Sequence, residues 1–207
     1  MYGQEYLNQI SASNKKDGAK TKNSFLSSKI VMIVVGAIVA VIIMAIIGGI
    51  LGSSKAKLPK QTSALKLHSD YIVEMVDVYQ DSLKSSLLRS YSSSLKSVLS
   101  ETSKGLSSYL EKKHGLKKDK DFNSKVISQA DTMKDALNTE LFEAKINGIL
   151  DRTFDRKMIY EISILMTEES DVLRIAGKDE ELTNVLNTSY DSLKKLYDNF
   201  DSFSEAK

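Results

Sequence analysis

The feature that most constrains this chain is an uncharged, apolar run from Ile30 to Leu51, which reads IVMIVVGAIVAVIIMAIIGGIL. As an α-helix, these residues would extend about 33 Å, which matches the roughly 30 Å hydrocarbon core of a bilayer. A buried helix of a soluble domain rarely runs this far without a polar face. The run therefore predicts one N-terminal transmembrane helix over residues 30–51.

A cleaved signal peptide is the alternative, because Ser54, Lys55 and Ala56 form a small-x-small pattern that would place the cut after Ala56. The apolar region of a signal peptide is usually about 7 to 15 residues long and follows a short basic stretch. Here the run is longer and follows a tail of 29 residues. We therefore expect a retained, uncleaved signal anchor.

The charges that flank the run discriminate little between the two orientations. Five lysines lie in residues 15–29, and four more follow the run at Lys55, Lys57, Lys60 and Lys66. Long domains translocate largely regardless of charge, and a short basic tail is usually kept inside. We expect a single-pass protein of the cytoplasmic (plasma) membrane, with the N-terminus inside and the C-terminal domain outside. If the orientation is reversed, the C-terminal domain would be a cytoplasmic scaffold.

Residues 1–29 form a short basic tail. Tyr2, Tyr6 and Ile10 are spaced four apart, so one or two helical turns would align them as an apolar stripe. One interpretation is a docking peptide for an unknown cytoplasmic protein partner. The other is a disordered basic tail that carries a few hydrophobic residues.

Small residues gather in the second half of the apolar run. They are Ala45, Gly48, Gly49 and Gly52, and Gly48 with Gly52 forms a GxxxG pair. Such residues let two helix backbones approach closely in lipid, which predicts a homo-oligomer formed through the transmembrane helix. The alternative is that glycine and alanine are simply common in membrane helices.

The remainder of the chain predicts an all-α fold. Pro59 is the single proline, and no period-two strand pattern follows it. Proline and glycine are the residues that helix interiors exclude most strongly. We expect a linker at residues 52–61 and, at residues 62–207, an antiparallel bundle of four to five helices.

Local signals predict where these helices begin and end. We expect a helical segment over 62–113 that breaks, if anywhere, in the serine-rich stretch 89–96, and a second over 122–147. A third runs over 149–176 and ends at Gly177, although the second and third segments could be continuous. Asp179 is the predicted N-cap of the last helix, whose heptad seam is interrupted only by Ser189. Coiled-coil pairing of this seam within the bundle is preferred over pairing between chains.

The lysine-rich connector EKKHGLKKDKD, residues 111–121, has two interpretations. It is either a contact point for an anion or a polymer, or a solvated loop whose acidic residues weaken its field.

Nothing in the sequence nominates an enzyme. His68 and His114 lie in no metal-like constellation, and we expect both to be exposed. The chain has no cysteine and no phosphate-binding or nucleophile motif, so no catalytic residue, metal or cofactor is predicted. The net charge of the chain is +2, and the first 29 residues contribute +3 while the remainder contributes −1. The chain therefore has no strongly basic domain of the kind that binds nucleic acid.

The order of parts resembles that of known membrane proteins. The chain has a tail bearing EYLNQI, then a lysine-rich spacer, one apolar helix and a helical ectodomain. Over the first 50 or so residues, this layout resembles that of single-pass envelope proteins of ultra-small host-dependent bacteria. The layout is also similar to LemA-type proteins, but their arginine-asparagine signature is not found and no named family is assigned.

These observations predict a membrane-anchored helical bundle that acts as an interaction or structural module of the cell envelope. The alternative is a bundle that binds a small ligand and signals through a cytoplasmic partner of the tail.

Overall fold

The computed structural model describes residues 54–205, and within this range the chain is all-helical. The predicted all-α class and the helical bundle are therefore confirmed. The α-helices are α3 (Ser54–Tyr79), α4 (Ser86–His114), α5 (Ser124–Ile146), α6 (Leu150–Ala176) and α7 (Glu180–Glu205). Two short 3-10 helices, η1 (Gln80–Ser82) and η2 (Asp119–Asp121), lie in the first two connections.

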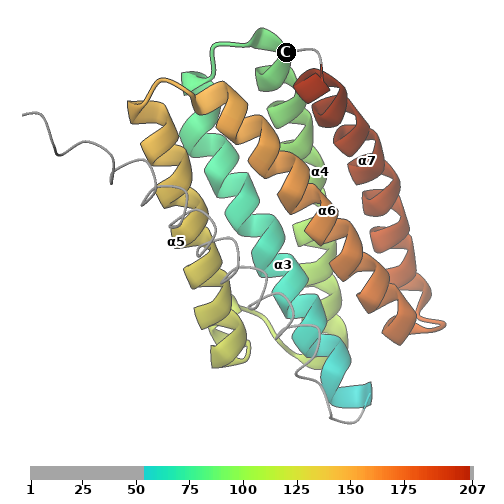
Figure 1. Ribbon diagram of the computed structural model, residues 1–207. Helices are drawn as coiled ribbons and strands as arrows, with labels where there is room; N and C mark the ends of the chain where they lie inside the picture. Colours follow the sequence, from blue (N-terminus) through green and yellow to red (C-terminus); the bar gives the residue numbers. More distant parts are fainter. Residues whose placement is uncertain (1–53, 206–207) are drawn as a thin grey trace, which may run out of the picture. The chain divides into compact units, whose positions relative to one another are not determined.

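Four of the helices form the bundle proper, and the fifth lies on its outside (Figure 1). Going around the bundle, α3 packs on α4, α4 on α7, α7 on α6 and α6 on α3. Because short connections join successive helices, each is antiparallel to its neighbours in this ring. The remaining helix, α5, packs against α3 and α6.

The predicted heptad seam of α7 faces the inside of this bundle. Leu182, Leu186, Leu193, Leu196 and Phe200 are all buried. The core also contains four large aromatic side chains with almost no exposure, which are Tyr79, Tyr109, Phe154 and Phe200. The described structure thus uses the seam for intramolecular packing, as the sequence predicted.

The predicted break in the serine-rich stretch 89–96 is wrong, because α4 runs through it. The hydroxyls of Ser92, Ser93 and Ser94 each donate to the carbonyl four residues earlier. Serine disfavours helix interiors when its side chain competes for backbone groups in another conformation. Here the hydroxyls bond to carbonyls that already belong to the helix, so the helix continues.

The actual break lies at residues 80–85, between α3 and α4. The Ser85 side chain caps α4 by accepting from the backbone N–H of Leu88. The Asp151 carboxylate, at the start of α6, accepts from the backbone N–H groups of Lys84 and Ser85 at 2.9 and 2.8 Å. The turn is therefore held by a residue 66 positions away, which no local pattern could reveal.

The predicted ends of the second and third segments, at residue 147 and at Gly177, and the predicted cap Asp179 agree with the structure to within a residue. Gly148 and Gly177 follow α5 and α6 with φ of +71° and +64°, a region that glycine enters without steric cost. The Asp179 carboxylate accepts from the backbone N–H of Leu182, which makes it the cap of α7. The second and third segments are thus separate helices.

The first bundle helix begins earlier than expected. Residues 54–61 belong to α3 and not to a linker, and Pro59 lies inside the helix. Proline lacks an N–H and clashes with the carbonyl four residues before it, but its fixed φ suits the first turns of a helix. Pro59 is close enough to the start of α3 to disturb a single helical hydrogen bond.

Several predictions fall outside the described residues. These are the transmembrane run 30–51, the tail residues Tyr2, Tyr6 and Ile10, and the small residues Ala45, Gly48, Gly49 and Gly52. Within residues 54–205, no helix is long and apolar enough to cross a membrane.

The close approach of α4 and α7 depends on Gly105. A Cβ atom at this position would lie 2.9 and 3.0 Å from the two Cγ atoms of Val185. We expect Gly105→Ala to lower the free energy of unfolding by about 1 kcal/mol, because overpacking costs about 1–3 kcal/mol and outweighs the better helix propensity of alanine. In a Val185→Ala background the same change should instead stabilise the protein by about 0.5–1 kcal/mol. Chemical denaturation of the four variants measures this coupling, and purely additive effects would contradict it.

Candidate functional site

Each helix of the four-helix ring places a polar residue among the apolar side chains of the core, and α3, α4 and α6 bury further polar residues besides. The four core residues are Ser69 on α3, Thr102 on α4, Glu169 on α6 and Ser189 on α7, and they are 0, 4, 0 and 3 % exposed. We call these four the polar layer. A polar group this deep must be hydrogen-bonded or must pay a desolvation penalty.

Contacts between neighbouring helices place the four residues at one level of the bundle. The hydroxyls of Thr102 and Ser189 lie 2.8 Å apart. Residues adjacent to the layer also pair, because Ser103 donates to Asp70 at 2.5 Å and His68 bonds to Glu168 at 2.8 Å. The layer is therefore flanked by charged groups that link α3 to both α4 and α6.

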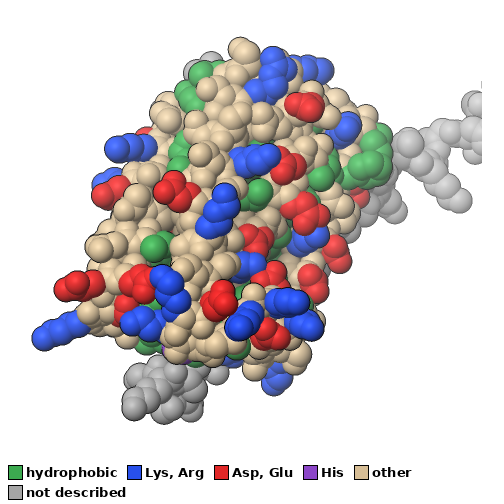
Figure 2. All heavy atoms as spheres, turned by 180° about the vertical axis from the view of Figure 1, so that it is seen from behind, with side chains coloured by type: hydrophobic (Ala, Val, Ile, Leu, Met, Phe, Trp, Pro, Cys, Tyr) green, Lys and Arg blue, Asp and Glu red, His purple; other side chains and the backbone are tan. Residues whose placement is uncertain are grey.

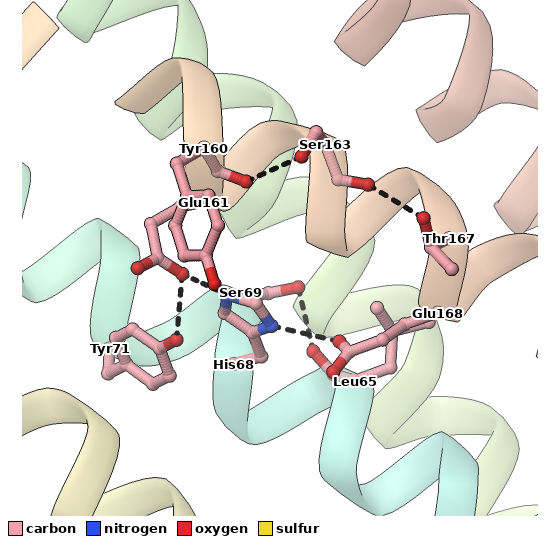
Figure 3. Close-up of polar contacts among 9 residues, drawn as sticks. All are labelled: Leu65, His68, Ser69, Tyr71, Tyr160, Glu161, Ser163, Thr167 and Glu168. Carbon is pink, nitrogen blue, oxygen red and sulfur yellow. Dashed lines mark hydrogen bonds and ion pairs between the residues drawn. The ribbon is translucent and has the colours of Figure 1, made fainter. Parts of the chain in front are cut away.

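The charged part of this site centres on His68 (Figure 3). The imidazole lies between α3 and α6, with Nδ1 2.8 Å from one carboxylate oxygen of Glu168 and Nε2 3.0 Å from one of Glu161. The same Glu161 oxygen accepts from the hydroxyl of Tyr71 at 3.1 Å. The rings of His68 and Tyr71 are stacked with centroids 4.7 Å apart. We call these four residues the His68 cluster.

The geometry of the cluster fits a positively charged histidine. Both ring nitrogens face carboxylates, and only the imidazolium can donate from both. Burial lowers the pKa of His68, but the negative charge of Glu168 and the hydrogen bonds to Glu161 and Glu168 together outweigh it and raise the pKa to about 10. Burial, together with the charges of Glu161 and Glu168, also raises the pKa of Tyr71 well above its ordinary value, so Tyr71 stays a neutral donor.

Glu169 lies next to this cluster in the sequence but in a different environment. Neither carboxylate oxygen has a hydrogen bond of good geometry among the described residues. Burial raises its pKa to about 8, the Ser189 hydroxyl offsets part of that shift, and the charge of Glu168 adds to it. Near neutral pH the bundle thus holds a charged histidine and, close by, a largely protonated carboxyl group.

The expectation that His68 is exposed is wrong, because it is 3 % exposed. His114 is exposed, as expected. A sequence signal for the site did exist, since residues 158, 162, 165, 169, 172 and 176 follow the apolar register of α6 and Glu169 is its one charged member. Glu161 and Glu168 gave no such signal, because their pairing with His68 spans about a hundred residues.

The arrangement is suited to holding protons and charge. Both His68 nitrogens are engaged, so neither is available as a general base. Among the described residues, no group of three or more His, Asp or Glu side chains is placed to hold a metal ion.

The chain was compared with family models, curated proteins and solved structures, and none of them matches it.

Proposed function

We propose that this protein is a single-pass membrane protein whose helical bundle acts by contact with another protein of the cell envelope, without catalysis. The apolar run 30–51 is the anchor, and the lipid bilayer is the first partner. In this proposal the N-terminus lies inside the cytoplasmic membrane and the bundle lies outside. The run's length and lack of charge support the anchor, and the short basic tail supports the orientation.

The observation that carries the contact function is an exposed apolar stripe on the outer helix α5 and the turn that follows it. Phe142, Ile146 and Ile149 are 54, 69 and 53 % exposed. Phe142 and Ile146 lie one turn apart on α5, and Ile149 lies in the turn that follows this helix. We call these three residues the α5 stripe. Other side chains form the core of the bundle, and the α5 stripe is exposed to solvent. The stripe is therefore shielded from water only when another molecule covers it.

Two further contacts belong to this proposal. Ala45, Gly48, Gly49 and Gly52 would let the anchor pair with a second copy, which makes the protein a homo-oligomer in the membrane. Tyr2, Tyr6 and Ile10 would dock a cytoplasmic protein.

Site-specific photo-crosslinking in intact cells tests the role of the α5 stripe. A photoreactive phenylalanine analogue at Ile146 should give a discrete adduct with one protein, because Ile146 is the most exposed side chain of the stripe at 69 %. The matched control is the analogue at Ser128, an exposed residue of the same helix. Equal labelling at both positions, or none at Ile146, would count against the contact function.

Orientation is tested separately by protease treatment of intact cells. Digestion of the C-terminal bundle from outside is expected. Protection in intact cells followed by digestion after lysis would show that the bundle is cytoplasmic.

A second candidate is a sensory bundle, and one observation favours it. The His68 cluster and the polar layer place ionisable groups between the helices, where a change of protonation or ligand would alter packing. Small cations, amines and carboxylates that raise the melting temperature of the wild type but not of Glu169→Gln would support sensing.

A further inference from the structure

Lysines that are scattered in the sequence meet at one end of the bundle. This end comprises the first half of α3, the connector between α4 and α5, and the turn between α6 and α7 with the first turn of α7. Lys66 on α3 reaches Asp119 of the connector at 2.5 Å. From α4, Tyr109 reaches Asp179 of the α6–α7 turn, and Lys112 reaches Glu181 in the first turn of α7. These contacts place three segments of the chain side by side, at the lower end of the molecule in Figure 1.

The charge at this end differs in sign from that of the bundle as a whole. Its basic residues are Lys57, Lys60, Lys66, Lys112, Lys113, Lys117, Lys118, Lys120, Lys125, Arg174 and Lys178. Its acidic residues are Asp70, Glu111, Asp119, Asp121, Asp171, Asp179, Glu180 and Glu181. The excess is three positive charges, although the chain from residue 30 onward carries −1, so the bundle is polarised along its axis. We call this the basic end, and Figure 2 shows Lys and Arg side chains along it, interspersed with acidic ones.

Several acidic residues of the basic end are occupied by structural contacts. Asp119 pairs with Lys66, and Asp121 accepts from the backbone N–H groups of Lys117 and Lys118. By contrast, Lys113, Lys117, Lys118 and Lys120 are exposed, and none forms an ion pair among the described residues. The lysines therefore remain available to a partner from outside.

The chain itself brings a partner of the right charge to this end. The apolar run ends at Leu51 and α3 begins at Ser54, three residues later. Three Cα steps extend at most about 11 Å. The Debye length at physiological ionic strength is about 8 Å, so charges near the start of α3 would act on the surface of the bilayer that holds the run. A cluster of lysines beside an anchor is the pattern that attracts anionic lipid headgroups.

We infer that the basic end is a docking surface for anionic phospholipid, which holds the bundle against the membrane instead of letting it stand away on a linker. This inference rests on the proposed anchor at residues 30–51. It gives the connector 111–121 a partner of defined chemistry, whichever side of the membrane the bundle occupies. The α5 stripe, which lies toward the opposite end of α5, would then face away from the bilayer.

The test uses the full chain in vesicles and a label on a single cysteine. The wild type contains no cysteine, so Ser124→Cys at the basic end and Ser90→Cys at the opposite end can each carry one donor fluorophore. The vesicles contain a headgroup acceptor in phosphatidylcholine, either alone or with phosphatidylglycerol. We expect energy transfer from position 124 to rise about twofold with the anionic lipid and to return to the neutral value in high salt. Transfer from position 90 should stay low.

Charge reversal supplies the matched comparison. Replacing Lys113, Lys117, Lys118 and Lys120 with glutamate should abolish the rise at position 124. Replacing Lys84, Lys145, Lys194 and Lys195, which are also exposed but lie outside the basic end, should leave it unchanged. Circular dichroism checks that both charge-reversal variants are folded. The salt dependence of the energy transfer is measured with all native lysines present, so it tests the docking surface even if a variant fails to fold.

The outcomes separate the docking surface from the anchor. Flotation of the full chain with phosphatidylcholine vesicles reports the anchor alone. If the chain floats but energy transfer is the same in both lipids, the docking surface is overturned and the anchor stands. If it floats only with anionic vesicles, the anchor is overturned. If the four lysines are needed to bind soluble polyphosphate but do not change the transfer, the surface recognises a polymer and the lipid assignment fails.

Discussion

Replacing His68 with alanine is expected to lower the free energy of unfolding by about 3–5 kcal/mol. The change leaves Glu161 and Glu168 without the cation that now bonds to both, and Glu161 is itself buried. Removing one partner of a buried ion pair costs more than the pair is worth, because the remaining charge stays desolvated. Denaturant unfolding of the full chain in detergent, followed by circular dichroism, measures the loss as a lower midpoint at an unchanged slope.

His114→Ala is the matched control, because this histidine is exposed and its loss should change stability by less than about 0.5 kcal/mol. A second control replaces the charges together. His68→Leu with Glu161→Leu and Glu168→Gln should recover at least half of the loss, since an apolar replacement removes the uncompensated charge. A cost for His68→Ala no larger than that of His114→Ala would show that the cluster is not formed as described.

The second large effect is a fall in stability as the pH rises from about 5 to 10. The folded-state pKa of Glu169 is raised to about 8 from the ordinary 4.5, and that of His68 to about 10 from 6.5. In both cases the folded state binds the proton more tightly than the unfolded chain does. The stabilisation is therefore fully present below the unfolded pKa and is lost as the pH rises through the folded one. Glu169 contributes between about pH 4.5 and 8, and His68 between about 6.5 and 10.

One pKa unit corresponds to about 1.4 kcal/mol, so the combined loss between pH 5 and 9 should be roughly 3 kcal/mol or more. Thermal and denaturant unfolding across this range measure it. Variants separate the contributions of the two residues to the pH dependence of stability. Glu169→Gln removes the part between about pH 4.5 and 8, so this variant should be more stable than the wild type at pH 9 but not at pH 5. The cost of His68→Ala should shrink as the pH approaches 10. A stability that rises from pH 5 to pH 9 would contradict both assignments.

The helix ends were predictable wherever one local group decides them. Gly148, Gly177 and Asp179 mark ends that the structure confirms, because left-handed backbone and a capping carboxylate act within a few residues. The α3–α4 break was not predictable in this way. Asp151 fixes it from α6, while the serine-rich stretch that favoured a break stays helical through its own hydroxyl-to-carbonyl bonds.

Some residues of the candidate site were likewise predictable from the sequence, and others were not. Glu169 and Ser189 stand out in the sequence as polar residues at apolar positions of a seam. His68, however, was expected at the surface, because its two carboxylate partners lie 93 and 100 residues away. Burial of a charged residue can be predicted only when its counter-charges are known, because the free-energy cost of burying an unpaired charge is prohibitive.

The sequence by itself determined that the described part of the chain is helical, where most of its helices end, and which face of the last helix is buried. Each of these follows from periodicity and capping, which act over a few residues. Only the tertiary structure decided that α5 lies outside a four-helix ring, that a charged histidine sits between α3 and α6, and that lysines from separate segments form one basic end. These depend on which helices become neighbours, and long-range packing, not local preference, selects those neighbours.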